Sequence, residues 1–93
     1  MATETLVKKS TARKHVPMYR VLLHNDDFNS MEHVVQVLLI TIPGMQTSQA
    51  TDIMLEAHNQ GLAVVIVVPQ EHAEFYCEQL KMHGLFSSIE PES

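Results

Sequence analysis

The chain has 93 residues, of which 45% are hydrophobic, and its formal net charge is -5 at pH 7. A chain of this length forms one domain with a thin core, and its composition is typical of a folded protein rather than a disordered one. The single cysteine, Cys77, excludes an intramolecular disulfide framework and a cysteine-rich zinc module, and it favours a reducing compartment. No apolar run reaches the roughly 18 to 20 residues of a membrane span, and no apolar signal segment opens the sequence. We therefore expect a cytoplasmic protein that does not contact membranes.

The positive charges gather near the N-terminus. Four of the six lysines and arginines lie within residues 1–17, whereas most of the acidic residues lie beyond Pro17. The part of the chain beyond Pro17 is acidic and therefore repels polyanions, so we expect no nucleic-acid partner. Residues 1–17 also lack apolar periodicity, so the sequence predicts a flexible N-terminal arm over 1–17 and a folded domain over 18–93.

Patterns of apolar and polar residues predict the elements of this domain in chain order. Runs rich in β-branched residues predict strands, apolar residues at helical spacing predict helices, and glycine, proline and asparagine–aspartate clusters separate them. The predicted elements are a strand over 18–24, a helix over 31–42 capped by Asn29 or Ser30, a helix from Thr47 or Ser48 to about Gln60, a strand over 62–68, a helix with Pro69 in its first turn that ends at Gly84, and a strand over 85–89.

This order predicts an α+β two-layer sandwich, in which three helices cover one face of a three-stranded antiparallel sheet. The run over 62–68 is continuously apolar and rich in β-branched residues. We expect it to be the central strand, because a strand between two others is the most completely buried.

The densest polar cluster is the Asn-Asp-Asp sequence at 25–27, where the first strand turns into the first helix. Spacing alone favours a simple turn and helix cap here. His58 shares an apolar stripe of the second helix with Met54, which is more often the arrangement of a core histidine than of a ligand. If the two helices pack as a hairpin, however, Met31 and Val34 face Met54 and His58 across a pocket whose rim is 25–27.

These residues resemble the opening motif of the ClpS adaptor family. The likeness covers residues 18–90 and includes the order of elements. Its motifs are YRVLLHNDDF at 19–28, Met31-Glu32 and Val34, Ala50-Thr51 through Met54, and His58-Asn59-Gln60-Gly61. The resemblance implies an adaptor that binds destabilising N-terminal residues of substrate proteins, typically Phe, Tyr, Trp or Leu. It further implies delivery of these substrates to the N-terminal domain of a ClpA-like or ClpC-like AAA+ unfoldase.

The resemblance also assigns an amine site. A free α-amino group is a cation with three hydrogen-bond donors, so its site needs clustered acceptors. By resemblance, Asn25 and His58 contact the amine directly, and Asp26 acts partly through water and by charge. Asp27 completes the acidic motif. Asn29 stands where the family usually has a threonine that hydrogen-bonds the substrate backbone.

A second part of the implied site encloses the first side chain of the substrate. Its walls are Met31, Val34, Met54, Ala57 and, by family alignment, Leu85. Met31 matches a family gate that rejects β-branched side chains, although a methionine at helical spacing is also typical of ordinary core. Ala57 replaces a larger valine, which leaves the preference between aromatic residues and leucine open.

The unfoldase-binding surface is less clear from the sequence. Glu71 matches a family position, and Tyr76 stands where a lysine is common. Both also fit the solvated face of a helix. Residues 1–17 resemble the family's delivery arm but equally fit a solubilising tail.

Two other classes of protein stay open at this point. Six histidines and several carboxylates suggest a metal-binding protein, but no His-x-x-x-His pair occurs. The same order of elements occurs in the C-terminal interaction domain of the ribosomal stalk protein, which lacks the Asn-Asp-Asp and His pairing. No nucleophile has an evident base and no glycine-rich phosphate loop is present, so we expect a monomeric non-enzyme without metal or cofactor.

Overall fold

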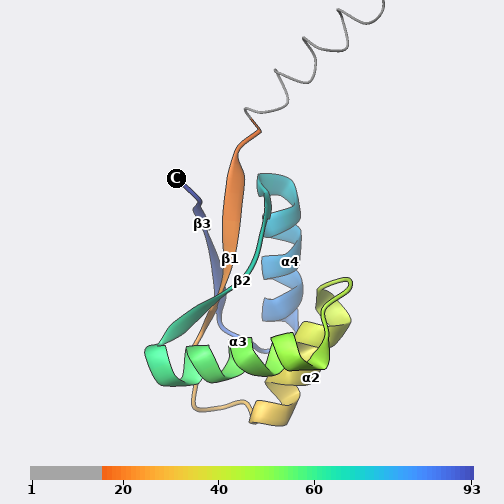
Figure 1. The fold of residues 1–93 in the computed structure, drawn as a ribbon, viewed down its shortest axis with the longest axis vertical. Coiled ribbons are helices and arrows are strands. Elements are labelled where there is room, and N and C mark those ends of the chain that lie inside the picture. Colours follow the sequence, from red (N-terminus) through yellow and green to blue (C-terminus); the bar gives the residue numbers. More distant parts are fainter. Residues whose placement is uncertain (1–15) are drawn as a thin grey trace, which may run out of the picture.

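The computed structural model describes residues 16–93, so the predicted flexible arm over 1–17 lies almost wholly outside the described residues. Along the described chain the elements are β1 (Met18–His24), α2 (Met31–Thr41), α3 (Thr47–Gln60), β2 (Leu62–Pro69), α4 (Gln70–Met82) and β3 (Ser87–Pro91) (Figure 1). This succession confirms the predicted order of elements. Within residues 16–93, three helices and a three-stranded antiparallel sheet also confirm the α+β class.

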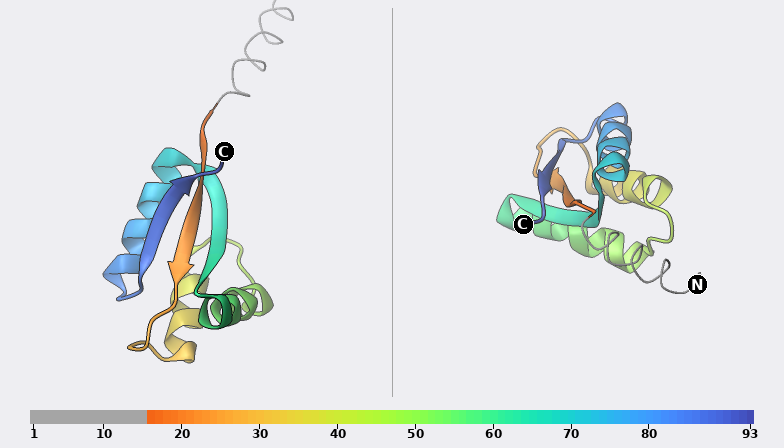
Figure 2. Two further views of the ribbon diagram at one scale, coloured as in Figure 1. Left: turned by 90° about the vertical axis from the view of Figure 1, so that its left-hand side faces the viewer. Right: turned by 90° about the horizontal axis from the view of Figure 1, so that it is seen from above.

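The central strand is β1, and the prediction that the apolar run over 62–68 would be central is wrong. The strand order is β2-β1-β3, with β1 antiparallel to both neighbours (Figure 2). β2 is an edge strand, and Leu62 and Val64 on its outward side are 44% and 41% exposed. Its continuous apolar run therefore combines core residues with exposed apolar residues, which a hydropathy pattern cannot separate.

The first two helices begin at predicted residues, and they end at or within one residue of the predicted ends, since α2 stops at Thr41 with Ile42 as its C-cap. The hydroxyl of Ser30 caps α2 by accepting a hydrogen bond of 3.0 Å from the His33 amide. At the start of α3, Gln46 and Gln49 form a reciprocal capping box. Gly61 ends α3 in the left-handed conformation, with φ of 98°, as the C-terminal cap predicted from the sequence requires.

Two boundaries around α4 differ from the predicted ones. Pro69 precedes the helix as its N-cap residue, whereas it was expected in the first turn. The last strand begins at Ser87 rather than Leu85. The reason is that the amides of Gly84 and Leu85 still bond to the end of α4, at Lys81 O (2.9 Å) and Leu80 O (3.1 Å). The backbone must leave this capping turn before it can pair with β1.

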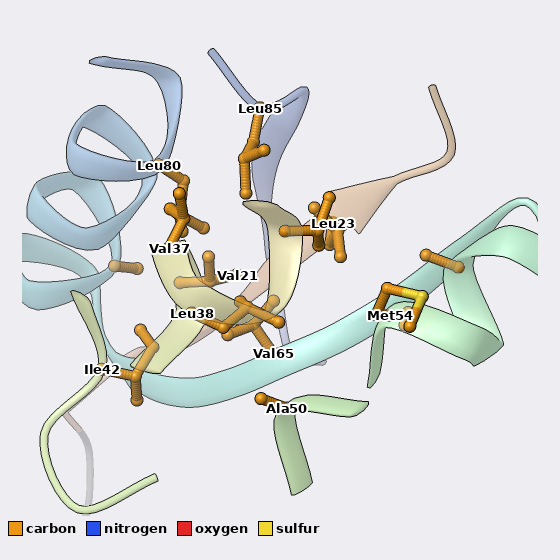
Figure 3. Packing of buried hydrophobic residues seen from close by; sticks show 14 residues of the cluster. Val21, Leu23, Val37, Leu38, Ile42, Ala50, Met54, Val65, Leu80 and Leu85 are labelled. Carbon is orange, nitrogen blue, oxygen red and sulfur yellow. The ribbon is translucent and has the colours of Figure 1, made fainter. Parts of the chain in front are cut away.

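The core lies between the sheet and the helices. Strand alternation turns Val21 and Leu23 of β1 toward this core, where they are 0% and 2% exposed. All three described helices contribute to the same cluster, as Figure 3 shows for Leu38 of α2, Met54 of α3 and Leu80 of α4. The helices therefore cover one face of the sheet, and the apolar stripe of each faces the strands.

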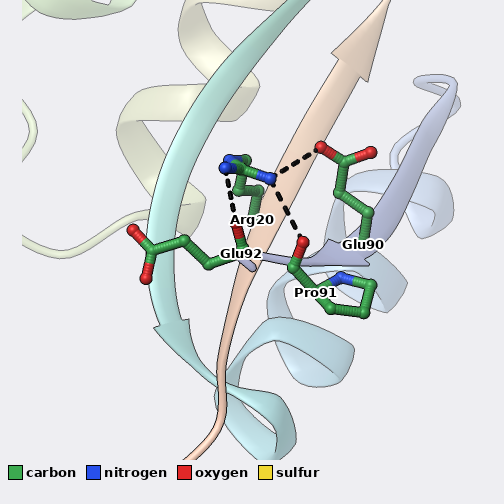
Figure 4. Close-up of polar contacts among 4 residues, drawn as sticks. All are labelled: Arg20, Glu90, Pro91 and Glu92. Carbon is green, nitrogen blue, oxygen red and sulfur yellow. Dashed lines mark hydrogen bonds and ion pairs between the residues drawn. The ribbon is translucent and has the colours of Figure 1, made fainter.

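The opposite face of the sheet carries polar contacts. Arg20 of β1 forms an ion pair of 3.0 Å with Glu90 of β3, and it also donates to the carbonyl groups of Pro91 (3.1 Å) and Glu92 (2.7 Å) (Figure 4). A partly exposed pair of this kind contributes little free energy by itself. The three contacts together hold the end of the chain on β1. No helix in the described part of the chain is long and apolar enough to cross a bilayer.

Candidate functional site

A pocket opens where β1 ends, between the start of α2 and the second half of α3. Its volume is about 40 Å³. The lining residues are Leu23, His24, Asn25, Asp26, Asn29, Met31, Val34, Met54, Ala57 and His58. The pocket thus combines apolar walls from two helices with a polar rim from the loop that joins β1 to α2.

Most of the residues predicted for the site line this pocket. The acceptors Asn25, Asp26 and His58 are brought together, and so are the walls Met31, Val34, Met54 and Ala57, with Asn29 beside them. The hairpin of α2 and α3 that the sequence required for this arrangement is present. The structure also adds Leu23 and His24, which were missed. Strand alternation already turns Leu23 toward the helices, so the sequence pattern could have identified this residue as part of the pocket.

Leu85 and Asp27 do not line the pocket. Leu85 is 2% exposed and belongs to the same core cluster as Leu23 (Figure 3). Its side chain lies in the core because its amide is still bonded to Leu80 O at the end of α4. Asp27 is exposed and follows the lining residue Asp26 in the loop.

The loop that carries the acceptors is fixed by hydrogen bonds. The amide of Asn25 donates to the carbonyl of Gly61 (3.0 Å), which places this loop against the C-terminal end of α3, close to His58. One oxygen of Asp26, Oδ1, accepts from the amides of Phe28 (2.9 Å) and Asn29 (2.7 Å). The turn expected at 25–27 is therefore formed, and it also presents a set of acceptors to the pocket.

The carboxyl group of Asp26 is held ionised. Partial burial raises its pKa, but hydrogen bonds from the backbone and side chain of Asn29 and from the backbone of Phe28, with the charge of His33, lower it by more. The pKa of Asp26 therefore lies below the ordinary aspartate value. Because the pKa is lowered in the folded state, Asp26 stabilises the fold above the ordinary aspartate pKa. This stabilisation is lost as the pH falls through the lowered value.

The pocket has the chemistry of a site for a cation joined to an apolar group. The side chains of Asn25, Asp26 and His58 supply an amide oxygen, a carboxylate and an imidazole nitrogen. The apolar walls begin directly beside them. No group of histidine, cysteine and acidic side chains within residues 16–93 is arranged to hold a metal ion.

Glu71 and Tyr76 lie elsewhere in the molecule. Glu71 is exposed in the first turn of α4, and Tyr76 is half-buried with its ring 5.7 Å from that of Phe75. The start of α4 follows Pro69, which pairs with Met18 at the beginning of β1. The pocket is at the other end of β1, so the start of α4, where Glu71 lies, is separated from it by the length of the strand (Figure 1). Tyr76 lies midway along α4 and does not line the pocket.

Comparisons with known proteins agree with this architecture. The family model described as "ATP-dependent Clp protease adaptor protein ClpS" matches residues 14–88. The chain is 60% identical over 92 residues to the ATP-dependent Clp protease adapter protein ClpS of Gloeobacter violaceus, and the match covers 99% of both chains. It is 61% identical over 94 residues to the protein of the same name from Synechococcus elongatus, again over 99% of both.

A solved structure shows the same fold. The structure of Agrobacterium tumefaciens ClpS2 bound to L-phenylalaninamide superimposes with a TM-score of 0.76 and 33% sequence identity, over 84% of this chain and 100% of that one. The sequence matches and the shared fold extend over the strands, the helices and the pocket. The chain therefore belongs to the ClpS family of adaptor proteins of the ATP-dependent Clp protease.

Proposed function

We propose that this adaptor binds proteins through a large apolar residue at their N-terminus and delivers them to a Clp AAA+ unfoldase. The observation that carries the proposal is the meeting of three acceptors and an apolar hollow in one pocket. The ligand of the Agrobacterium relative supports it, because L-phenylalaninamide combines a free amine with a Phe side chain. The catalysis of proteolysis belongs to the partner.

The amine half of the site consists of Asn25, Asp26 and His58. Asn25 and a neutral His58 accept hydrogen bonds from the α-amino group, and the carboxylate of Asp26 adds an opposite charge. Hydrogen bonds to a charged group contribute about 1.5 to 3 kcal/mol each. Acetylation of the amine removes the charge and two donors, so it removes most of this contribution.

The side-chain half of the site requires Met31 to move. A volume of about 40 Å³ has room for a few water molecules but not for an aromatic ring. Met31 is 47% exposed and also lines a neighbouring open groove between α2 and α3, so its side chain has space to turn aside. Burial of a Phe or Leu side chain then contributes roughly 1.5 to 3 kcal/mol. Met31 thus acts as a gate, which can open because its own side chain is flexible and unbranched.

A series of fluorescent peptides that differ only in their first residue tests the proposal. We expect peptides that begin with Phe, Tyr or Leu to bind. A peptide that begins with Val should have an affinity at least about tenfold lower, because its branched Cβ meets the gate. The measurement is fluorescence anisotropy at neutral pH. Each peptide is repeated with an acetylated amine, for which we expect no saturable binding. Equal binding of the acetylated and free Phe peptides would refute the amine site.

Replacement of Met31 by alanine tests the gate. We expect the Val-initiated peptide to gain affinity relative to the Phe-initiated one, because the obstacle to a branched side chain is removed. The same anisotropy series measures the ratio of the two dissociation constants. Met82→Ala is the matched control, since Met82 is 73% exposed at the end of α4 and does not line the pocket, so this change should leave the ratio unchanged. An unchanged ratio in Met31→Ala would contradict the gate.

The unfoldase partner is proposed to bind the start and outer face of α4. Glu71 is exposed there, and Phe75 is 57% exposed beside Tyr76. Val16 and Pro17, at the end of the predicted arm, line a hollow together with Glu71, so the arm joins the domain at this face. Since the substrate pocket lies at the other end of β1, substrate and unfoldase can be bound at the same time. The N-terminal domain of a ClpA-like or ClpC-like protein is the proposed partner.

A further inference from the structure

We propose that Asn29 is a positioning residue, which orients the Asp26 carboxylate for the substrate amine and braces it against the turn that follows α4. This inference rests on the proposed function, because it concerns how the amine site is held in place. It assigns Asn29 a different task from the substrate-backbone contact that its place in the motif implies. The argument starts from the contacts of its side chain.

The side-chain amide of Asn29 lies between two acceptors. Its Nδ2 atom is 3.2 Å from Oδ2 of Asp26 and 2.8 Å from the carbonyl oxygen of Gly84. An ionised carboxylate and a backbone carbonyl only accept hydrogen bonds, so the nitrogen and not the oxygen of the amide must face them. An NH2 group has two protons, and these two partners take both. Its nitrogen therefore has no donor left for a substrate carbonyl.

The oxygen that Asn29 orients is the one available to the substrate. Oδ1 of Asp26 already accepts from the amides of Phe28 and Asn29, which occupy both of its lone-pair directions. Oδ2 has the Asn29 side chain as its partner and retains one direction. An amine in the pocket therefore approaches Oδ2. The direction of this remaining lone pair is set by the Asn29 amide.

The turn that braces Asn29 is itself held firmly. The ring nitrogen Nε2 of His33 lies 2.8 Å from the His83 carbonyl oxygen, so two successive carbonyls of this turn are bonded from the start of α2. Gly84 has a left-handed backbone with φ of 89°. Its amide bonds to Lys81 O (2.9 Å), and the amide of Leu85 bonds to Leu80 O (3.1 Å). Asn29 thus links the acceptor Asp26 to a fixed point at the end of α4.

A double-mutant cycle on the full chain tests this assignment. The dissociation constant of a Phe-initiated peptide is measured for wild type, Asn29→Ala, Asp26→Ala and the double variant. We expect Asn29→Ala to weaken binding about three- to tenfold, and the double variant to bind no more weakly than Asp26→Ala. This result follows if Asn29 acts through Asp26. If the increase in dissociation constant of the double variant equals the product of the two single increases, Asn29 contacts the substrate independently of Asp26. That result would overturn the proposal.

A second measurement needs no peptide. The side-chain bond from Asn29 is one of the causes that lower the pKa of Asp26, so we expect this pKa to rise in Asn29→Ala. It is followed by the carboxyl carbon shift of Asp26 in an NMR titration of the free protein. Asn29→Leu, which keeps bulk without a donor, should give the same rise. Asn59→Ala, an exposed amide on α3 outside the pocket lining, is the matched control and should leave the titration unchanged.

The two measurements separate this inference from the proposed function. If wild type fails to bind any Phe-initiated peptide, the proposed function is wrong, while the Asp26 titration still decides whether Asn29 orients the carboxylate. If wild type binds but the Asp26 titration is the same in Asn29→Ala and in wild type, the positioning role is wrong and the proposed function stands.

Discussion

Replacement of Asn25 by alanine is expected to raise the dissociation constant of a Phe-initiated peptide by about 10- to 100-fold. The lost acceptor faces a charged amine, and a hydrogen bond of this kind contributes about 1.5 to 3 kcal/mol, of which each 1.4 kcal/mol corresponds to a factor of ten. The loop should keep its place, because the backbone amide of Asn25 and not its side chain bonds to Gly61 O. Isothermal titration calorimetry with the free and the acetylated peptide measures the effect.

Asn59→Ala is a suitable control for this prediction as well. It removes the same chemical group from an exposed position one residue after His58, outside the lining of the pocket. We expect the affinity of the Phe-initiated peptide for this variant to equal that of wild type. If Asn25→Ala also retained wild-type affinity, the amine would have to be bound by other acceptors, and the central part of the proposed site would fail.

Replacement of Leu38 by alanine is expected to lower the free energy of unfolding by about 3 kcal/mol. Leu38 is 0% exposed and packs in the core between α2 and the sheet, so its removal leaves a cavity (Figure 3). Domains of ordinary size have only about 5 to 15 kcal/mol of stability, so this loss is a large part of the total. Urea denaturation followed by circular dichroism at 25 °C gives the difference.

The same helix provides the control for this prediction. Ile40 lies two residues further along α2 and is 70% exposed. Ile40→Ala removes a similar amount of apolar side chain but creates no cavity, so we expect a change within about 0.5 kcal/mol. Comparable losses in the two variants would show that α2 does not bury the face that carries Leu38.

The elements of the fold were predictable because local chemistry sets most of their limits. Ser30 caps α2, Gly61 caps α3, and the turn at 25–27 ends β1, each by interactions among residues close in sequence. Two features were not local and were predicted wrongly. The position of β2 at the edge depends on which strand pairs with β1 on its other side. The start of β3 depends on the bonds that Leu85 keeps to α4.

The residues of the candidate site that belong to a sequence motif were predictable. Asn25, Asp26 and His58 were recognised by resemblance, and the structure brings them into one pocket. Membership of the ClpS family favours this adaptor over the alternative of an interaction domain like that of the ribosomal stalk. The burial of Leu85 in the core could not be predicted from the sequence, because family alignment fixes the position of this residue along the chain but not the direction of its side chain.

The sequence by itself determined the order of the elements, the caps at Ser30 and Gly61 and the types of side chain at the pocket. These follow from periodicity, from turn chemistry and from a motif, which involve neighbours along the chain. Only the tertiary structure decided which strand is central and which partners Asn29 has. Gly84 is far from Asn29 in sequence, and their hydrogen bond exists because the sheet and the helix pair bring the end of α4 to the start of α2. Contacts of this kind depend on the packed fold, so local patterns do not contain them.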